Sequence, residues 1–167
     1  MIRDMKVWYL HGLESNPGGP KVDFLNEVAN EVFAPAMDYR NHKTFGELYR
    51  KVTKEGKPDL IIGSSMGGYF ADALASHFGI DVLLFNPALH SRSIERNLPY
   101  GDNYGKRHFN LGSEDKVIDY TKTIDLLQQD KNFIESDNTV TITSNGHRTP
   151  LTVFKDIYNE TVVNAIK

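Results

Sequence analysis

The most informative part of the chain is the nine-residue stretch Leu60-Ile61-Ile62-Gly63-Ser64-Ser65-Met66-Gly67-Gly68. Its first three residues are continuously apolar, as in a parallel strand that is buried on both faces. The pattern Gly-x-Ser-x-Gly follows and leads into an amphipathic stretch, so we predict a strand, a sharp turn and a helix. Such a turn holds Ser65 in a strained conformation, and its hydroxyl then projects above the sheet as a candidate nucleophile.

The same turn also has a purely structural interpretation, because glycine-rich turns between a strand and a helix serve tight packing or phosphate binding. The stretch lacks the lysine of a P-loop and the Gly-x-Gly-x-x-Gly spacing of a dinucleotide site. We therefore favour catalysis, with Ser65 rather than the adjacent Ser64 as nucleophile. The backbone amide of Met66 is then expected to stabilise a developing oxyanion.

Short apolar runs alternate with amphipathic stretches on both sides of this turn, which is typical of a parallel sheet with helices on both faces. We expect strands at residues 7–10, 32–34, 60–62, 82–85, 108–111 and 140–142, and helices within residues 25–32, 45–52, 70–78, 117–127 and 154–166. In the last strand, Val140 and Ile142 alternate with threonines, which indicates a face open to water near a sheet edge. The predicted class is α/β, with a mostly parallel sheet of about six strands.

A serine nucleophile needs a base, usually histidine, and an acid that orients the base. Functional groups gather at the carboxyl ends of parallel strands, and His147 comes directly after the last predicted strand. The chain order serine, acid, histidine is that of α/β-hydrolases, which places the acid after the preceding strand. Asp115 is the first choice there, with Glu114 and Asp119 as alternatives. Asp115 has a structural interpretation as well, as the N-cap of the following helix.

The end of the first predicted strand contains a His-Gly turn, His11-Gly12, followed by Leu13. Such a turn commonly shapes an oxyanion hole, so the amide of Leu13 is expected to join that of Met66. We also expect His11 to contact the substrate. A plain structural turn explains the dipeptide equally well.

One long irregular segment, residues 87–106, is rich in Asn, Gly, Pro and Tyr. It is either a crossover loop or a lid over the active site, and we favour the lid because long loops in small domains tend to be functional. Tyr100 and Tyr104 are then expected to contact the substrate.

The composition agrees with a single domain over residues 1–167, since 40% of the residues are hydrophobic and 25% are charged. A net charge of −3 provides no broad basic surface, so neither nucleic acid nor an anionic membrane is an expected partner. The absence of cysteine excludes disulfides and thiolate metal sites, and we expect neither a metal nor an organic cofactor. The first apolar run, residues 7–10, is too short for a signal peptide or a membrane span, so a cytoplasmic location is expected.

The chain resembles the small YqiA- and YcfP-like bacterial esterases of the α/β-hydrolase superfamily. The resemblance rests on segments that occur in the family's order, namely Tyr9-Leu10-His11-Gly12, Gly63-Ser64-Ser65-Met66-Gly67-Gly68-Tyr69, Asn86-Pro87-Ala88, Glu114-Asp115-Lys116-Val117-Ile118-Asp119-Tyr120 and Asn145-Gly146-His147. It implies a truncated α/β-hydrolase fold that begins at the strand with the His-Gly turn. It also implies Ser65 as nucleophile, Asp115 as acid and His147 as base. The chain departs from the family at Leu13, where an aromatic residue is common, and at Glu114, where the family usually has glycine before the acid.

Together these features predict a serine hydrolase that cleaves a small-molecule carboxylic ester or thioester through an acyl-serine intermediate. The alternative from another functional class is a non-catalytic binding or interaction module on the same scaffold.

Overall fold

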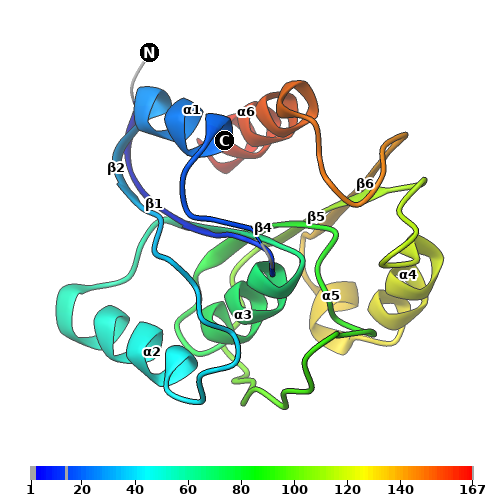
Figure 1. Cartoon of the computed structure of the whole chain (residues 1–167), viewed down its shortest axis with the longest axis horizontal. Coiled ribbons are helices and arrows are strands. Elements are labelled where there is room, and N and C mark those ends of the chain that lie inside the picture. The colour runs from blue at the N-terminus through cyan, green and yellow to red at the C-terminus, as the bar shows by residue number, and fades with distance from the viewer. Residues whose placement is uncertain (1–2, 14, 167) are drawn as a thin grey trace.

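The structure, a computed structural model, describes residues 3–13 and 15–166. Within these residues, six parallel strands form one sheet in the order β2-β1-β3-β4-β5-β6 (Figure 1). The strands are β1 (Arg3–Leu10), β2 (Ala29–Phe33), β3 (Leu60–Ser64), β4 (Asp81–Phe85), β5 (Arg107–Gly112) and β6 (Thr139–Thr143).

Helices cover both faces of this sheet. They are α1 (Pro20–Val28), α2 (Thr44–Glu55), α3 (Met66–Ala75), α4 (Tyr120–Gln128), α5 (Lys131–Glu135) and α6 (Leu151–Ile166). Figure 1 shows α1 and α6 on one face and α2, α3, α4 and α5 on the other. The predicted α/β architecture is therefore confirmed. No described helix combines the length and the apolar character needed to cross a membrane.

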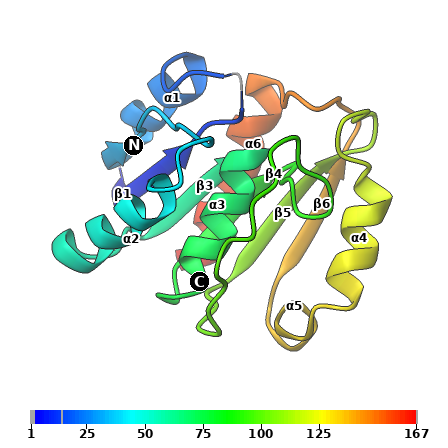
Figure 2. The same cartoon turned by 60° about the horizontal axis from the view of Figure 1, so that its bottom comes forward.

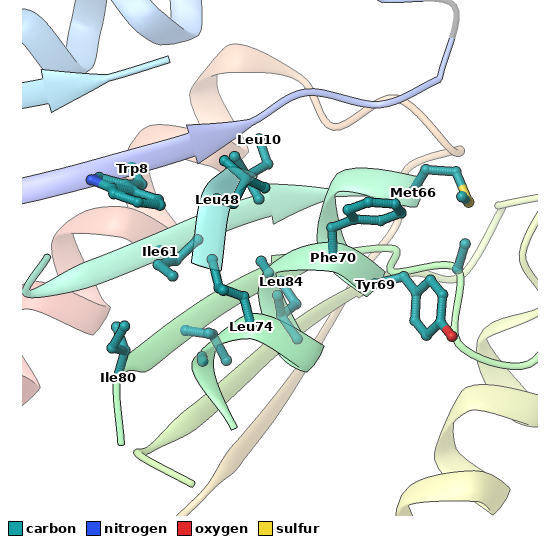
Figure 3. Close-up of a cluster of buried hydrophobic side chains, with 14 of the residues drawn as sticks. Trp8, Leu10, Leu48, Ile61, Met66, Tyr69, Phe70, Leu74, Ile80 and Leu84 are labelled. Carbon is teal, nitrogen blue, oxygen red and sulfur yellow. The ribbon is translucent and has the colours of Figure 1, made fainter. Parts of the chain in front are cut away.

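Alternate residues of the strands fill two hydrophobic cores, because successive side chains of a strand point to opposite faces. From β1, Val7 and Tyr9 pack with α1 and α6, whereas Trp8 and Leu10 pack with α2 and α3. Figure 3 shows the core on the α3 side, with the labelled residues Trp8, Leu10, Leu48, Ile61, Met66, Tyr69, Phe70, Leu74, Ile80 and Leu84. The central strands are thus buried on both faces, as their continuous apolar runs predict.

The structure corrects three helix boundaries. Ala29 and Val32, which fit a helical stripe with residue 25, belong to strand β2, because pairing with β1 outweighs the local pattern. Helix α3 ends at Ala75, so Phe78 lies in the turn that leads to Gly79, whose φ is +66°. Val117 precedes α4 and is 60% exposed.

The last strand lies at the edge of the sheet and has one face open to water, as predicted, and that face is the one with the valine and the isoleucine. Val140 and Ile142 are exposed, whereas Thr141 and Thr143 are half-buried. The threonine side faces α6, since Thr141 borders a small hollow together with Ile157 of that helix. The five-residue helix α5 was not expected, because it is too short to display a helical period.

A buried ionic cluster ties β5 to α3. The Arg107 guanidinium donates two hydrogen bonds to the Asp72 carboxylate, at 2.9 and 2.8 Å, and a third to Asp130 at 2.6 Å. The Tyr100 hydroxyl donates to Asp72 at 2.9 Å. Asp72 is 1% exposed and Arg107 is 3% exposed. Each buried charge is therefore stabilised by its partner, and loss of either partner would destabilise the fold.

We expect Arg107→Met to lower the free energy of unfolding by about 3–5 kcal/mol, because it leaves the Asp72 carboxylate buried without a cation. Urea denaturation measures this loss. The matched control is Lys51→Met, which removes a partly exposed ion pair with Glu55 and should cost less than about 1 kcal/mol. Equal losses in the two variants would contradict a structural role for the buried pair.

Candidate active site

The site lies where the strand order reverses. The chain passes from β1 outward to β2 and then returns to the other side of β1 with β3, so the loops after β1 and β3 diverge. Ligand sites in parallel α/β sheets form at such a point, at the carboxyl ends of the strands. The paired residues Leu10 and Gly63 bring those two strand ends together.

Ser65 lies in the sharp turn between β3 and α3, with φ 56° and ψ −118°. This conformation is costly for a residue with a side chain and persists only where the surrounding structure imposes it. Backbone hydrogen bonds to β4 and to the segment that follows it impose this conformation: the Ser65 amide donates to Phe85 O at 3.1 Å, and Ser65 O accepts from Ala88 N at 3.0 Å.

The two glycines of the Gly-x-Ser-x-Gly pattern allow the backbones to approach closely. A Cβ atom on Gly63 would lie 2.4 Å from the carbonyl oxygen of Gly67. One on Gly67 would lie 2.0 Å from the carbonyl oxygen of Leu10. Both distances are far below van der Waals contact, so the first turn of α3 reaches β1 because neither glycine carries a side chain.

Ser65, His147 and Asp115 form a continuous series of hydrogen bonds. The Ser65 Oγ lies 3.0 Å from Nε2 of His147, and Nδ1 of His147 lies 2.8 Å from Oδ2 of Asp115. The Asp115 side chain is fully buried and that of His147 is 25% exposed. When Nδ1 donates to the carboxylate, the lone pair of Nε2 faces the serine hydroxyl, as a general base requires. The structure thus brings together the three residues selected from the sequence.

The structure also distinguishes the roles of the three acidic residues considered as partners of His147. Oδ1 of Asp115 accepts hydrogen bonds from the amides of Val117 and Ile118, at 2.8 and 2.9 Å, which holds the carboxylate toward His147. Glu114 has an exposed side chain. Asp119 is the N-cap of α4 and accepts from the Thr121 amide at 3.0 Å. The cap role considered for Asp115 therefore belongs to Asp119.

Asn86, for which the sequence pattern predicted no role, positions the loops on which Asp115 and His147 lie. It follows β4 with φ 44° and is 1% exposed. Its Oδ1 accepts from the Gly112 amide at 2.7 Å, and its Nδ2 donates to the carbonyl oxygen of His147 at 2.9 Å. It thereby links the loop that contains His147 to the end of β5, from which the Asp115 loop starts. The segment Asn86-Pro87-Ala88 was a signal, since asparagine after a buried strand tolerates a positive φ better than most residues.

The amides proposed for an oxyanion hole lie at the ends of β1 and β3. A Cβ atom on Gly12 would lie 3.5 Å from Cβ of Ser65, so the His-Gly turn adjoins the serine. Within residues 3–13 and 15–166, the amides of Leu13 and Met66 have no hydrogen-bond acceptor. Met66 begins α3, and the first amides of a helix have no partner within it.

His11 lines neither of the two hollows that border Ser65. Its ring is buried, with Nε2 accepting from the Met37 amide at 2.9 Å and Nδ1 2.7 Å from Gly12 O. Because Nε2 accepts, Nδ1 carries the proton and donates to Gly12 O. The Tyr39 hydroxyl donates to the carbonyl oxygen of His11. The residue expected to bind substrate instead fixes the shape of the turn.

Ser65 borders two hollows, whose linings have only Leu13 and Ser65 in common. The larger has a volume of about 390 Å³ and its lining includes Leu13, Lys21, His147 and Arg148. The smaller has a volume of about 220 Å³ and is lined by Leu13, Ser65, Met66, Ala88, Ser91, Arg92, Ser93, Val117 and Ile118. A ligand held at Ser65 can therefore extend into either hollow.

The larger hollow contains groups with shifted pKa values. Burial lowers the pKa of Lys21, and the positive charge of Arg148 lowers it further. Burial raises the pKa of the Tyr9 phenol, which lines the same hollow, to about 12, so this group is neutral around pH 7.

Tyr100 and Tyr104 lie elsewhere. They line a third hollow, of about 500 Å³, together with Asp72 and Arg107, and neither borders the hollows at Ser65. The segment 87–106 runs alongside α3 toward the amino ends of the strands (Figure 2), where the Gly101 amide donates to the Ser76 hydroxyl at 2.8 Å. The prediction that these tyrosines contact the substrate is not supported. Only the beginning of the segment, residues 88–93, forms a wall of the site.

The sequence matches the profile of an uncharacterised protein family, UPF0227, over residues 6–98. A UPF0227 protein from Vibrio cholerae serotype O1 is 28% identical over 149 residues, which cover 73% of this chain and 82% of that protein.

Solved structures share the fold over nearly the whole chain. A Xanthomonas campestris protein of the α/β hydrolase superfamily superposes with a TM-score of 0.74 at 18% identity, covering 96% of this chain and 98% of that one. A monoacylglycerol lipase from Paleococcus ferrophilus has a TM-score of 0.69 at 15% identity, with coverage of 94% and 92%. These likenesses identify the fold as that of the α/β hydrolases.

We expect Gly67→Ala to destabilise the protein by about 3 kcal/mol or more, because the added methyl group meets backbone atoms that cannot rotate away. Gly46→Ala is the matched control in α2, where the nearest atom is the end of the Arg50 side chain at 3.5 Å. It should stabilise by about 0.5–1 kcal/mol through helix propensity. Thermal unfolding compares the two variants, and a Gly67→Ala protein as stable as the wild type would refute the close approach.

Proposed function

The chain belongs to the uncharacterised protein family UPF0227, and we propose that it is a serine hydrolase that cleaves a carboxylic ester or thioester through an acyl-serine intermediate. The observation that carries this proposal is the hydrogen-bond series from Asp115 through His147 to Ser65, with the serine in a strained turn. The similar Paleococcus protein, a monoacylglycerol lipase, supports ester hydrolysis as the reaction class.

The proposed reaction begins with attack of Ser65 Oγ on the carbonyl carbon of the substrate. His147 Nε2 accepts the serine proton, and the Asp115 carboxylate stabilises the imidazolium that forms. The carbon–oxygen or carbon–sulfur bond to the leaving group then breaks. His147 returns the proton to the leaving atom, and an acyl-serine remains.

Deacylation repeats these roles with water as nucleophile. His147 accepts a proton from the water as its oxygen attacks the acyl carbon, and the imidazolium then protonates Ser65 Oγ as the carboxylic acid departs. In both halves, the amides of Leu13 and Met66 are proposed to stabilise the negative charge on the carbonyl oxygen.

Covalent labelling with a fluorophosphonate probe tests the proposal directly. The wild type should be labelled at Ser65, as identified by mass spectrometry, and should hydrolyse chromogenic esters. A non-catalytic module on the same scaffold would show neither reaction.

Ser65→Ala should lower ester turnover by several orders of magnitude, about 10⁶-fold where comparable serines have been removed, with little change in thermal stability. Ser64→Ala is the matched control, because Ser64 ends β3 and has no bond to His147. Its turnover should remain within about tenfold of wild type. Similar losses in both variants would point to a structural turn instead.

Asp115→Asn should reduce turnover by roughly 10⁴-fold. The asparagine oxygen can still accept from the amides of Val117 and Ile118, so the turn is preserved. The amide nitrogen then faces His147 Nδ1 with a donor in place of an acceptor, which favours the wrong tautomer of the imidazole.

The controls for this variant are Glu114→Gln and Asp119→Asn, which should stay within about tenfold of wild type because asparagine also caps a helix well. Initial rates on one ester, with circular dichroism as a check of folding, measure all three. Full activity of Asp115→Asn would remove Asp115 from the mechanism.

A further inference from the structure

Two cations in the larger hollow at Ser65 lack an acidic partner within the part of the chain that the structure describes. Lys21 and Arg148 both line it. Among the described residues, no carboxylate lies within ion-pair distance, 4.0 Å, of either side chain, and none lines the hollow. The described lining of this hollow is therefore positively charged beside Ser65.

The surroundings strengthen this positive charge. Lys21 is half-buried and lies in the first turn of α1, whose amino end borders the hollow through Gly18 and Pro20. The partial positive charge at the start of a helix adds to that of the lysine. Burial and the charge of Arg148 both lower the pKa of Lys21. An anion bound near both cations would stabilise the charged lysine and so offset this lowering.

Arg92, at the smaller hollow, provides a contrast. Its guanidinium donates to Leu89 O at 2.6 Å and lies 4.3 Å from the centre of the Tyr69 ring. These contacts hold it as part of the wall. By comparison, Lys21 has only a ring contact, with its Nζ 5.6 Å from the centre of the Phe154 ring, and Arg148 has no hydrogen bond, ion pair or ring contact within the described residues.

The position of His147 indicates which end of the substrate enters the larger hollow. His147 must pass a proton from Nε2 to the leaving atom, so the leaving group lies on its side of Ser65. His147 lines the larger hollow and not the smaller one. The acyl chain then occupies the smaller hollow, whose wall includes the apolar side chains of Met66, Ala88 and Ile118.

We propose that the leaving group is an alcohol or thiol that carries a phosphate or carboxylate, and that Lys21 and Arg148 bind this anion. The inference rests on the serine hydrolase function proposed above and specifies the substrate class for the same site. Paired cations, here a half-buried lysine and an exposed arginine, bind such groups through charge-assisted hydrogen bonds.

Three butyrate esters of primary alcohols test the proposal: those of 2-hydroxyethyl phosphate, glycolate and 2-methoxyethanol. They share one acyl group and differ in the charge of the leaving group. We expect the wild type to have a kcat/KM at least about tenfold higher for an anionic ester than for the neutral one at low salt, and a smaller ratio at about 0.5 M salt, where charges are screened. Comparison of kcat/KM for the two anionic esters shows whether the site prefers a phosphate or a carboxylate.

Variants assign the effect to the two cations. In Lys21→Gln/Arg148→Gln the ratio of anionic to neutral kcat/KM should fall to near one, whereas in the control Lys51→Gln it should keep the wild-type value. A readout without turnover is the labelling of Ser65 by a neutral fluorophosphonate. The anionic alcohols should slow labelling of the wild type but not of the double variant, and 2-methoxyethanol should slow neither.

Equal kcat/KM values for the three esters in the wild type, or a ratio unchanged in the double variant, would overturn the anion site and leave the hydrolase function intact. Labelling of Ser65 without protection by either anionic alcohol would also overturn the anion site. Failure of the wild type both to label and to hydrolyse any ester would overturn the two proposals together.

Discussion

At Gly67 the first turn of α3 passes so close to the end of β1 that a methyl group would lie 2.0 Å from the Leu10 carbonyl oxygen. The rest of the site depends on this close approach. It sets the start of α3 directly beside the His-Gly turn, and it leaves Ser65 at a positive φ because the chain must reverse direction within one residue. The serine and the amides of Leu13 and Met66 are consequently held on rigid backbone rather than on a flexible loop, which is the kind of preorganisation that charge stabilisation in a reaction requires.

Asp115 and His147 follow β5 and β6, which lie beyond β4 from the strand that leads to Ser65, and they are held by a second set of backbone contacts. The Ser113 amide donates to Thr143 O at 2.9 Å and the Glu114 amide to Asn145 O at 3.1 Å, so the loops after β5 and β6 run together. Asn86 joins this pair of loops to β4, the neighbour of the strand that leads to the serine. Hydrogen bonds between neighbouring strands and their loops therefore connect a site assembled from five strand ends. The backbone segments that carry Ser65, His147 and Asp115 are each held in place by these bonds.

The features that could be predicted from the sequence are those in which a local pattern and the global fold require the same residues. The buried run at residues 60–62 and the glycines around Ser65 define the turn, and the parallel sheet then places His147 and Asp115 at the same edge. The roles of His11, Tyr100 and Tyr104 could not be predicted, because they depend on distant partners. His11 is held by the Met37 amide, and Tyr100 is held by Asp72 of α3. The boundary between α1 and β2 was missed for the same reason, since pairing with β1 decides where the strand begins.

The segment that carries His147 joins an edge strand to a helix packed on the centre of the sheet. On one side it follows β6, whose outer edge is unpaired in the described sheet. On the other side it enters α6, where the ring of Phe154 stacks on that of Phe85 with centroids 5.0 Å apart. Edge strands open easily in native-state fluctuations, whereas a central core opens only with global unfolding. Fraying of β6 leaves the histidine segment tethered by α6 and by Asn86, but it removes the hydrogen bond from the Ser113 amide to Thr143 O that holds the loops of His147 and Asp115 together. The lifetime of the aligned Ser65, His147 and Asp115 series is therefore set by the opening of this edge strand rather than by global unfolding.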